Sequence, residues 1–258
     1  MLLAMTFEYV DVETAKSASG TRLVINALVP SPWSEAMKGL FVVAQLPALA
    51  VRRALDTKAI DAWTGTDNAP ALFHGREPIR TNWAAIVAFV DRHAPDRGIL
   101  PTSLAGRVDA MGTLEMIAGE GGLGWNARIA MIDASFASGG TAGFPEMTAK
   151  FLAKRYGYVR GVIDATRERI KAQLDYLAAK LTGEYFGGKA PNAVDIYTAT
   201  FLTPVAAPVT EAECPAMIAP LRKAFDSAHA AFGPLVSPAL LAHRERMFER
   251  HLPRPIVL

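Results

Sequence analysis

Cysteine is almost absent from this chain of 258 residues, and neither sign of charge dominates. Because Cys214 stands alone, the chain can form no internal disulfide and no cysteine-based metal cluster, and we expect a reducing, cytoplasmic setting. The 27 basic and 25 acidic side chains leave a net charge of +2. So small an imbalance argues against a nucleic-acid partner.

Long hydrophobic runs are missing as well. The longest uncharged apolar stretch near the start, residues 39–51, contains Pro47 and falls short of the roughly 20 residues that cross a bilayer. The first five residues are apolar but have no basic start, unlike a secretory signal. We therefore expect no membrane association. At 51% hydrophobic and 20% charged residues, the composition is that of a globular protein.

Two regions differ in pattern. After a polar leader, short β-like and helical runs alternate, whereas a segment rich in proline, glycine and charge is followed only by helical runs. We expect strands at 22–28, 47–54, 71–74 and 79–80, and helices at 33–45, 56–63, 83–92, 103–117, 125–136, 145–156, 159–181, 192–202, 215–229 and 239–251. The predicted fold class is an α/β part followed by an all-α part. The expected ranges are 1–93, a linker at 94–101, and 102–258.

Three segments could carry chemistry. Ser31-Pro32 opens a helix, where a hydroxyl meets the positive end of the helix dipole and can stabilise an anion such as a thiolate. Ala69-Pro70 enters a strand, where a cis proline would leave backbone groups free to pair with an extended peptide. Thr81-Asn82 precedes another helix and forms a further anion site. In isolation, plain helix capping or an ordinary trans strand boundary is the commoner explanation of each segment.

Taken together, these segments resemble the cytosolic glutathione S-transferase family over nearly the whole chain. Ser31-Pro32-Trp33-Ser34 resembles the motif at the catalytic helix of the serine-type classes, and Ala69-Pro70 resembles a Val-Pro pair whose proline is cis. The resemblance implies a thioredoxin-like N-terminal domain and a helical-bundle C-terminal domain. Residues 188–195 resemble the family's capping box, in which Asn192 caps a helix and Asp195 returns to its backbone N–H.

The resemblance also implies an activity and a set of site residues. Ser31 takes the position that activates the thiol of glutathione, the co-substrate, for attack on a small electrophilic molecule. Glutathione contacts are implied for Trp33, Ser34, Ala69, Pro70, Thr81 and Asn82, and a second-substrate pocket for Trp125 and Arg128. A homodimer is implied too.

Two observations bear on alternatives. Thr81 and Asn82 stand where the family has an acidic residue and serine, which favours a rival hypothesis: a binding or assembly protein that keeps the fold without catalysis. A tryptophan such as Trp125 is more often plain buried core than part of a pocket. No two histidines have the spacing of metal ligands in the sequence, so we expect no metal.

Overall fold

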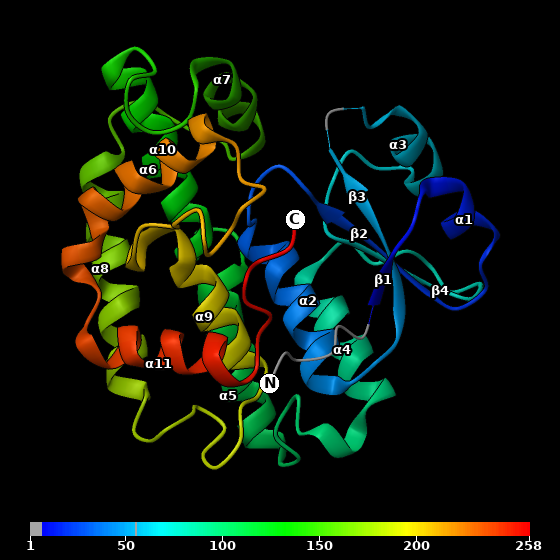
Figure 1. Cartoon of the computed structure of the whole chain (residues 1–258). Coiled ribbons are helices and arrows are strands. Elements are labelled where there is room, and N and C mark those ends of the chain that lie inside the picture. Colours follow the sequence, from blue (N-terminus) through cyan, green and yellow to red (C-terminus); the bar gives the residue numbers. More distant parts are fainter. Residues whose placement is uncertain (1–6, 55) are drawn as a thin grey trace.

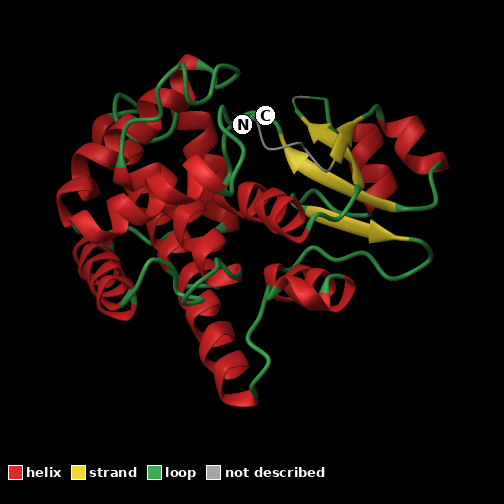
Figure 2. Ribbon diagram, turned by 60° about the horizontal axis from the view of Figure 1, so that its bottom comes forward, coloured by secondary structure: helices red, strands yellow, loops and turns green. Residues whose placement is uncertain are grey.

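The computed structural model describes residues 7–54 and 56–258, which form a small mixed sheet with its helices beside a larger all-helical part (Figures 1 and 2). The sheet order is β1-β3-β2-β4. The central strands β2 (Thr21–Asn26) and β3 (Ala48–Arg53) run parallel, and β4 (Ala71–His74) is antiparallel to β2. The predicted fold class, an α/β part followed by an all-α part, is confirmed.

Helices cover both faces of the sheet. Successive side chains of a strand point to opposite faces. Leu23 and Ile25 of β2 accordingly pack in the main core with α2 (Pro32–Ala44) and α4 (Trp83–His93), whereas Val24 packs in a second core with α3 (Lys58–Thr64). Because both faces of β2 are buried, apolar residues follow one another in its sequence without alternating with polar ones.

The segment before the first expected strand, predicted to be a polar leader, contains secondary structure that the sequence did not predict. Residues 7–17 contain β1 (Phe7–Tyr9), which pairs in parallel with β3, and α1 (Val12–Ser17), whose Ala15 is fully buried in the second core. Three residues are too few to show strand periodicity, and their partner strand lies some forty positions further along the chain. The strand expected at 79–80 is also reduced, to an isolated bridge between Leu72 and Arg80.

The second half of the chain is helical, as expected. Its helices are α5 (Leu104–Ala118), α6 (Leu123–Ser138), α7 (Glu146–Arg155), α8 (Ile163–Lys180), α9 (Ala193–Ala206), α10 (Ala219–Phe232) and α11 (Pro238–Arg250), with short 3-10 turns η1 (Pro95–Arg97) and η2 (Gly233–Leu235). The glycine-rich break falls between α5 and α6, as predicted. Helices α8 and α10 each begin four residues later than the patterns indicated.

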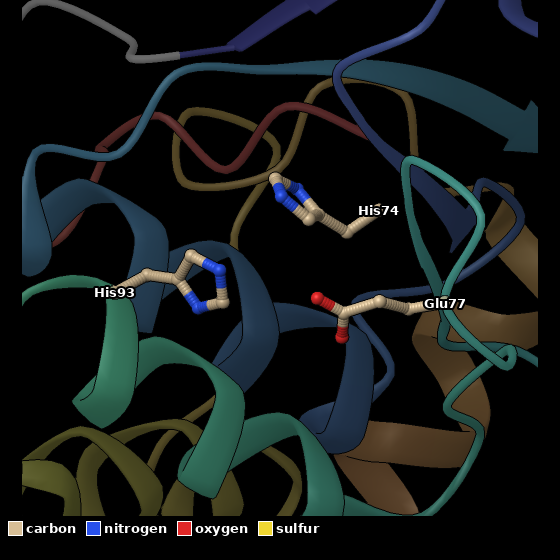
Figure 3. A group of neighbouring side chains, drawn as sticks. All are labelled: His74, Glu77 and His93. Atoms are coloured by element: carbon tan, nitrogen blue, oxygen red, sulfur yellow. The ribbon is translucent and has the colours of Figure 1, made fainter.

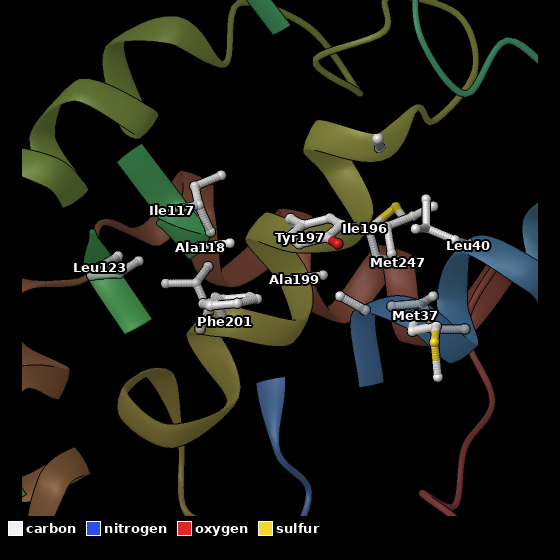
Figure 4. Close-up of a cluster of buried hydrophobic side chains, with 14 of the residues drawn as sticks. Met37, Leu40, Ile117, Ala118, Leu123, Ile196, Tyr197, Ala199, Phe201 and Met247 are labelled. Carbon is white, nitrogen blue, oxygen red and sulfur yellow. The ribbon is translucent and has the colours of Figure 1, made fainter. Parts of the chain in front are cut away.

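Helix α9 joins the two parts. All of its residues are buried, and Figure 4 shows its Ile196 beside Met37 and Leu40 of α2 and Met247 of α11. A Cβ atom at Gly39 would lie only 2.7 Å from Ile196 Cγ2, so glycine permits the close approach of α2 to α9. This packing fixes the helix that begins after Ser31 against the helical part.

The predicted capping box at the start of α9 is confirmed. The Asn192 side chain accepts from Val194 N at 2.8 Å, and the Asp195 carboxylate accepts from Asn192 N at 2.9 Å. Asp195 also accepts from the backbone of Phe186 and bonds to His243 at 2.8 Å. One buried carboxylate thus ties the preceding loop, α9 and α11 together.

Residues 252–258 pack back across α2 and the edge of the sheet (Figure 1). Lys38 donates to Val257 O and Arg52 donates to Leu258 O, each at 2.7 Å. Tyr9 donates to the same Val257 carbonyl, so β1 is held by both β3 and this segment. Among residues 7–54 and 56–258, no helix has the length and apolar character needed to span a membrane.

Candidate active site

A cavity of about 780 Å³ is lined by residues of both parts. One wall is formed by the segments that follow β2, precede β4 and precede α4. The opposite wall comes from α5, α6, α7 and α10. Eight of the nine predicted site residues line it: Ser31, Trp33, Ala69, Pro70, Thr81, Asn82, Trp125 and Arg128. Ser34 does not.

Ser31 occupies the position before the first turn of α2. Its backbone carbonyl accepts from Glu35 N at 2.9 Å, but its side chain makes no capping hydrogen bond. The Ser31 hydroxyl has no hydrogen-bond partner among the described residues. The hydroxyl oxygen is not fully buried, and Ser31 lines the cavity. The hydroxyl is therefore open to the cavity at the positive end of a helix dipole.

Trp33 and Ser34 are held by other contacts. The Trp33 indole N–H donates to Ala118 O at 2.9 Å, and its ring lies 4.8 Å from that of Phe201, so only the ring remains for a ligand. Ser34 is fully buried, and its hydroxyl accepts from Asn26 N at 3.2 Å. Ser34 can influence a ligand only by holding the loop after β2.

The peptide bond between Ala69 and Pro70 is cis, which confirms the expectation for this turn. Both residues line the cavity. None of the hydrogen bonds between residues described in the structure uses the Ala69 backbone. Its N–H and C=O groups are thus available to an extended ligand.

Thr81 and Asn82 lie at the start of α4 on the same wall. The Asn82 side-chain oxygen accepts from Ala84 N at 2.8 Å, which confirms its predicted role as a helix cap. The amide NH₂ of Asn82 has no hydrogen-bond partner within the described residues. A hydroxyl and an amide donor are therefore offered to a ligand here, with no carboxylate.

Trp125 and Arg128, both on α6, face this wall from the helical part. The Trp125 ring lies 4.7 Å from that of Tyr156, which also lines the cavity. Arg128 is buried, and burial lowers the pKa of its guanidinium, although the Tyr156 hydroxyl acts in the opposite direction. The second half of the chain thus contributes an aromatic pair and one buried cation.

Sequence reasoning missed several residues of the cavity. Asn26 and Arg53 line the cavity and are the last residues of the parallel strands β2 and β3. The Asn26 side chain accepts from Leu28 N at 3.0 Å, and Arg53 pairs with Asp61. Their position at the carboxyl ends of neighbouring parallel strands is a signal that could have found them. Asp67 and Tyr156 carry no such signal: Asp67 lies in a loop, and Tyr156 directly follows the last residue of α7.

A second group of titratable side chains lies away from the cavity. Figure 3 shows His74, Glu77 and His93 together, with one ligand-type atom of each within 4.8 Å of the others. The separation of His93 from His74 and Glu77 in the sequence gave no indication of this cluster. Glu77 pairs with Arg80 and Arg92, and this contact with Arg80 lowers the pKa of its carboxyl. Both guanidinium groups contact the same oxygen, Oε2, of this carboxylate.

Solved structures of glutathione transferases share this architecture. The enzyme from Methylobacterium radiotolerans, in complex with glutathione sulfonate, aligns with 92% of this chain and 97% of its own at 15% identity and a TM-score of 0.59. The enzyme from Methylobacillus flagellatus, with glutathione bound, aligns with 90% and 96% at 13% identity and a TM-score of 0.58. Glutathione transferase Omega 1C from Trametes versicolor aligns with 90% and 89% at 16% identity and a TM-score of 0.54.

The chain therefore has the glutathione transferase fold, with a thioredoxin-like part and a helical part, as the resemblance predicted. The sequence matches no protein-family model and no curated protein.

Proposed function

We propose that this protein activates the thiol of glutathione for attack on a small electrophilic molecule held in the cavity. The observation that carries the proposal is the Ser31 hydroxyl, which lines the cavity at the start of α2 without capping that helix. The Ala69 backbone on the same wall, unpaired among the described residues, supports it. The glutathione bound to structural neighbours is consistent with a ligand of this kind.

The chemistry requires a thiolate. The Ser31 O–H donates a hydrogen bond to the glutathione sulfur, and the dipole of α2 adds to the stabilisation, so the thiol loses its proton to solvent at a lower pH. The thiolate then forms a bond to the electrophilic atom and displaces its leaving group or adds to its double bond. Serine cannot form a mixed disulfide, which excludes that route.

The backbone of glutathione would pair with Ala69, while the Thr81 hydroxyl and the Asn82 amide would bind its γ-glutamyl carboxylate. Pro70 and the Trp33 ring would shape the same subsite. Because position 81 has no carboxylate, the ammonium group needs another partner. Asp67 on the same wall would supply one: its Oδ2 meets Arg155 at 3.5 Å, and its Oδ1 accepts no hydrogen bond from the described residues. Trp125 and Arg128 would contact the electrophile.

Retention on immobilised glutathione, followed by a conjugation assay with chlorodinitrobenzene, tests the proposal. We expect retention, elution by free glutathione, and turnover. Replacing Asp67 with asparagine should weaken retention about 10-fold, because a hydrogen-bonded charge pair is lost. Asp164→Asn, an exposed acidic residue on α8, is the matched control and should have no effect.

The two outcomes separate the proposed enzyme from its rival. Retention without turnover of any electrophile tried would favour the binding or assembly protein, for which the altered pair Thr81 and Asn82 is the motivating observation. Failure of the native protein to bind immobilised glutathione would contradict the proposed enzyme and would also favour the rival.

We further propose a cytoplasmic protein without a resident metal, membrane partner or nucleic-acid partner. Residues 1–93 would form the glutathione-binding domain, residues 94–101 the linker and residues 102–258 the helical domain. The absence of disulfide potential and the near-neutral charge support the setting and the partners.

We also expect a homodimer with twofold symmetry, the commonest closed oligomer. On α5, Leu104 and Val108 are four residues apart and are 79% and 66% exposed, an arrangement that suits a self-complementary contact. Sedimentation of this 27.7 kDa chain should give twice the monomer mass, and a Leu104→Asp, Val108→Asp variant should give the monomer. A native monomer at all concentrations from micromolar to millimolar would contradict the expectation.

A further inference from the structure

Arg128 is a buried cation without an anionic partner. Its side chain lines the cavity, yet the residue is only 6% exposed. In the described part of the chain it forms no ion pair with an acidic group. A charge removed from water in this way normally requires a paired charge or several hydrogen bonds.

The other buried arginines meet that requirement. Arg244 pairs with Glu213 at 2.6 Å and with Glu245 at 2.6 Å. Arg22 donates to the carbonyl groups of Ala18 and Gly75. Among the buried arginines described, Arg128 has the Tyr156 hydroxyl as its polar partner and no acidic group, and it alone lines a ligand-sized cavity.

The walls around Arg128 are mainly apolar. Its guanidinium carbon lies 5.4 Å from the ring centroid of Phe144 and 5.9 Å from that of Phe225. Leu221 of α10 and Trp125 line the same cavity, and the Tyr156 hydroxyl is the polar group acting on Arg128. A cation beside aromatic side chains at the cavity surface suits a ligand with a hydrophobic body and one anionic end.

We propose that Arg128 binds the carboxylate of the second substrate, so that the protein acts on an electrophile that is itself a hydrophobic organic acid. The guanidinium fork matches a carboxylate in two parallel hydrogen bonds, and the aromatic walls accept the hydrocarbon body. This inference rests on the proposed function in one respect only, that the cavity holds a second substrate beside the thiol.

Calorimetric titration with two unreactive probes tests the proposal without any turnover. The probes are 4-phenylbutanoate and 4-phenylbutanamide, which share a hydrophobic body and differ in the carboxylate. The native protein should bind the acid about 10-fold or more tightly than the amide, the scale of a hydrogen-bonded charge pair. Arg128→Gln should abolish this preference, and Arg128→Lys should retain part of it.

The matched control is Arg169→Gln, which removes one positive charge from the exposed face of α8 and should leave the preference intact. Survival of the preference in Arg128→Gln, or its absence from the native protein, would overturn the proposal. So would failure of the native protein to bind the acid at millimolar concentration. A loss of glutathione retention in Arg128→Gln, with acid binding unchanged, would assign Arg128 to the thiol instead.

Stability provides a second readout that a structural role would not produce. If Arg128 is retained for a ligand, Arg128→Met should fold with an unchanged or higher Tm, because an unpaired buried charge is removed. A markedly lower Tm would show that the guanidinium supports the fold. The probe measurement does not depend on glutathione, so a catalytically inactive protein could still bear out this inference.

Discussion

Replacing Ser31 with alanine is expected to lower the turnover of glutathione conjugation about 10²-fold, the scale for one oriented catalytic donor. The hydroxyl makes no capping bond, so its loss removes the hydrogen bond to the thiolate and little else. The pKa of the bound thiol should rise, because its anionic form loses a donor. The affinity for glutathione should change much less. Stopped-flow absorbance of the thiolate against pH, with steady-state rates, measures both effects.

A serine that does cap a helix provides the matched control. Ser237 accepts from Leu240 N at 3.3 Å at the start of α11 and does not line the cavity. Ser237→Ala should reduce the free energy of unfolding by about 1 kcal/mol and leave turnover unchanged. If Ser31→Ala instead kept its activity and lost stability in the same way, Ser31 would be a structural cap.

The largest effect on stability is expected from Asp195→Ala. This fully buried carboxylate accepts from the backbone N–H groups of Phe186, Gly187 and Asn192, and bonds to His243. Alanine would leave the Asn192 N–H and the His243 ring buried without their partner, and would remove the acceptor of the Phe186 and Gly187 N–H groups in the loop before α9. We expect a loss of about 3–5 kcal/mol in the free energy of unfolding, measured by urea denaturation.

Asp175 offers a comparison on the surface. It pairs with Lys171 at 2.5 Å along α8, with both side chains more than half exposed. Asp175→Ala should change the free energy of unfolding by about 0.5 kcal/mol or less. Equal effects of the two substitutions would mean that the burial and hydrogen bonds of Asp195 do not contribute as argued.

Local signals predicted most of the fold. Helix caps are read from adjacent residues, and the predicted bonds of Asn82, Asn192 and Asp195 are all present. Strand β1 escaped prediction because its stability comes from β3 and from the segment containing Val257, which are remote in sequence. Short elements of this kind have no periodicity of their own.

The candidate site was predicted in part. Ser31, the cis Ala69-Pro70 pair and Thr81 were singled out because each adjoins the end of a strand or the start of a helix, where local geometry exposes backbone and dipole. Asp67 and Tyr156 were not, since a loop brings Asp67 to the cavity and the tertiary placement of α7 brings Tyr156, its C-terminal cap residue, there.

The sequence by itself determined the division into α/β and helical parts, the caps and the positions where an anion could be stabilised, because these depend on neighbours a few residues apart. Tertiary structure alone decided which of these groups remain free. In the folded protein the Trp33 N–H donates to Ala118 O, and Ser34 is buried. The Ser31 hydroxyl is open to the cavity, and Arg128 has no carboxylate partner. The burial and the hydrogen-bond partners of a polar group depend on which distant segments pack against it. The residues next to that group in the sequence do not determine this packing.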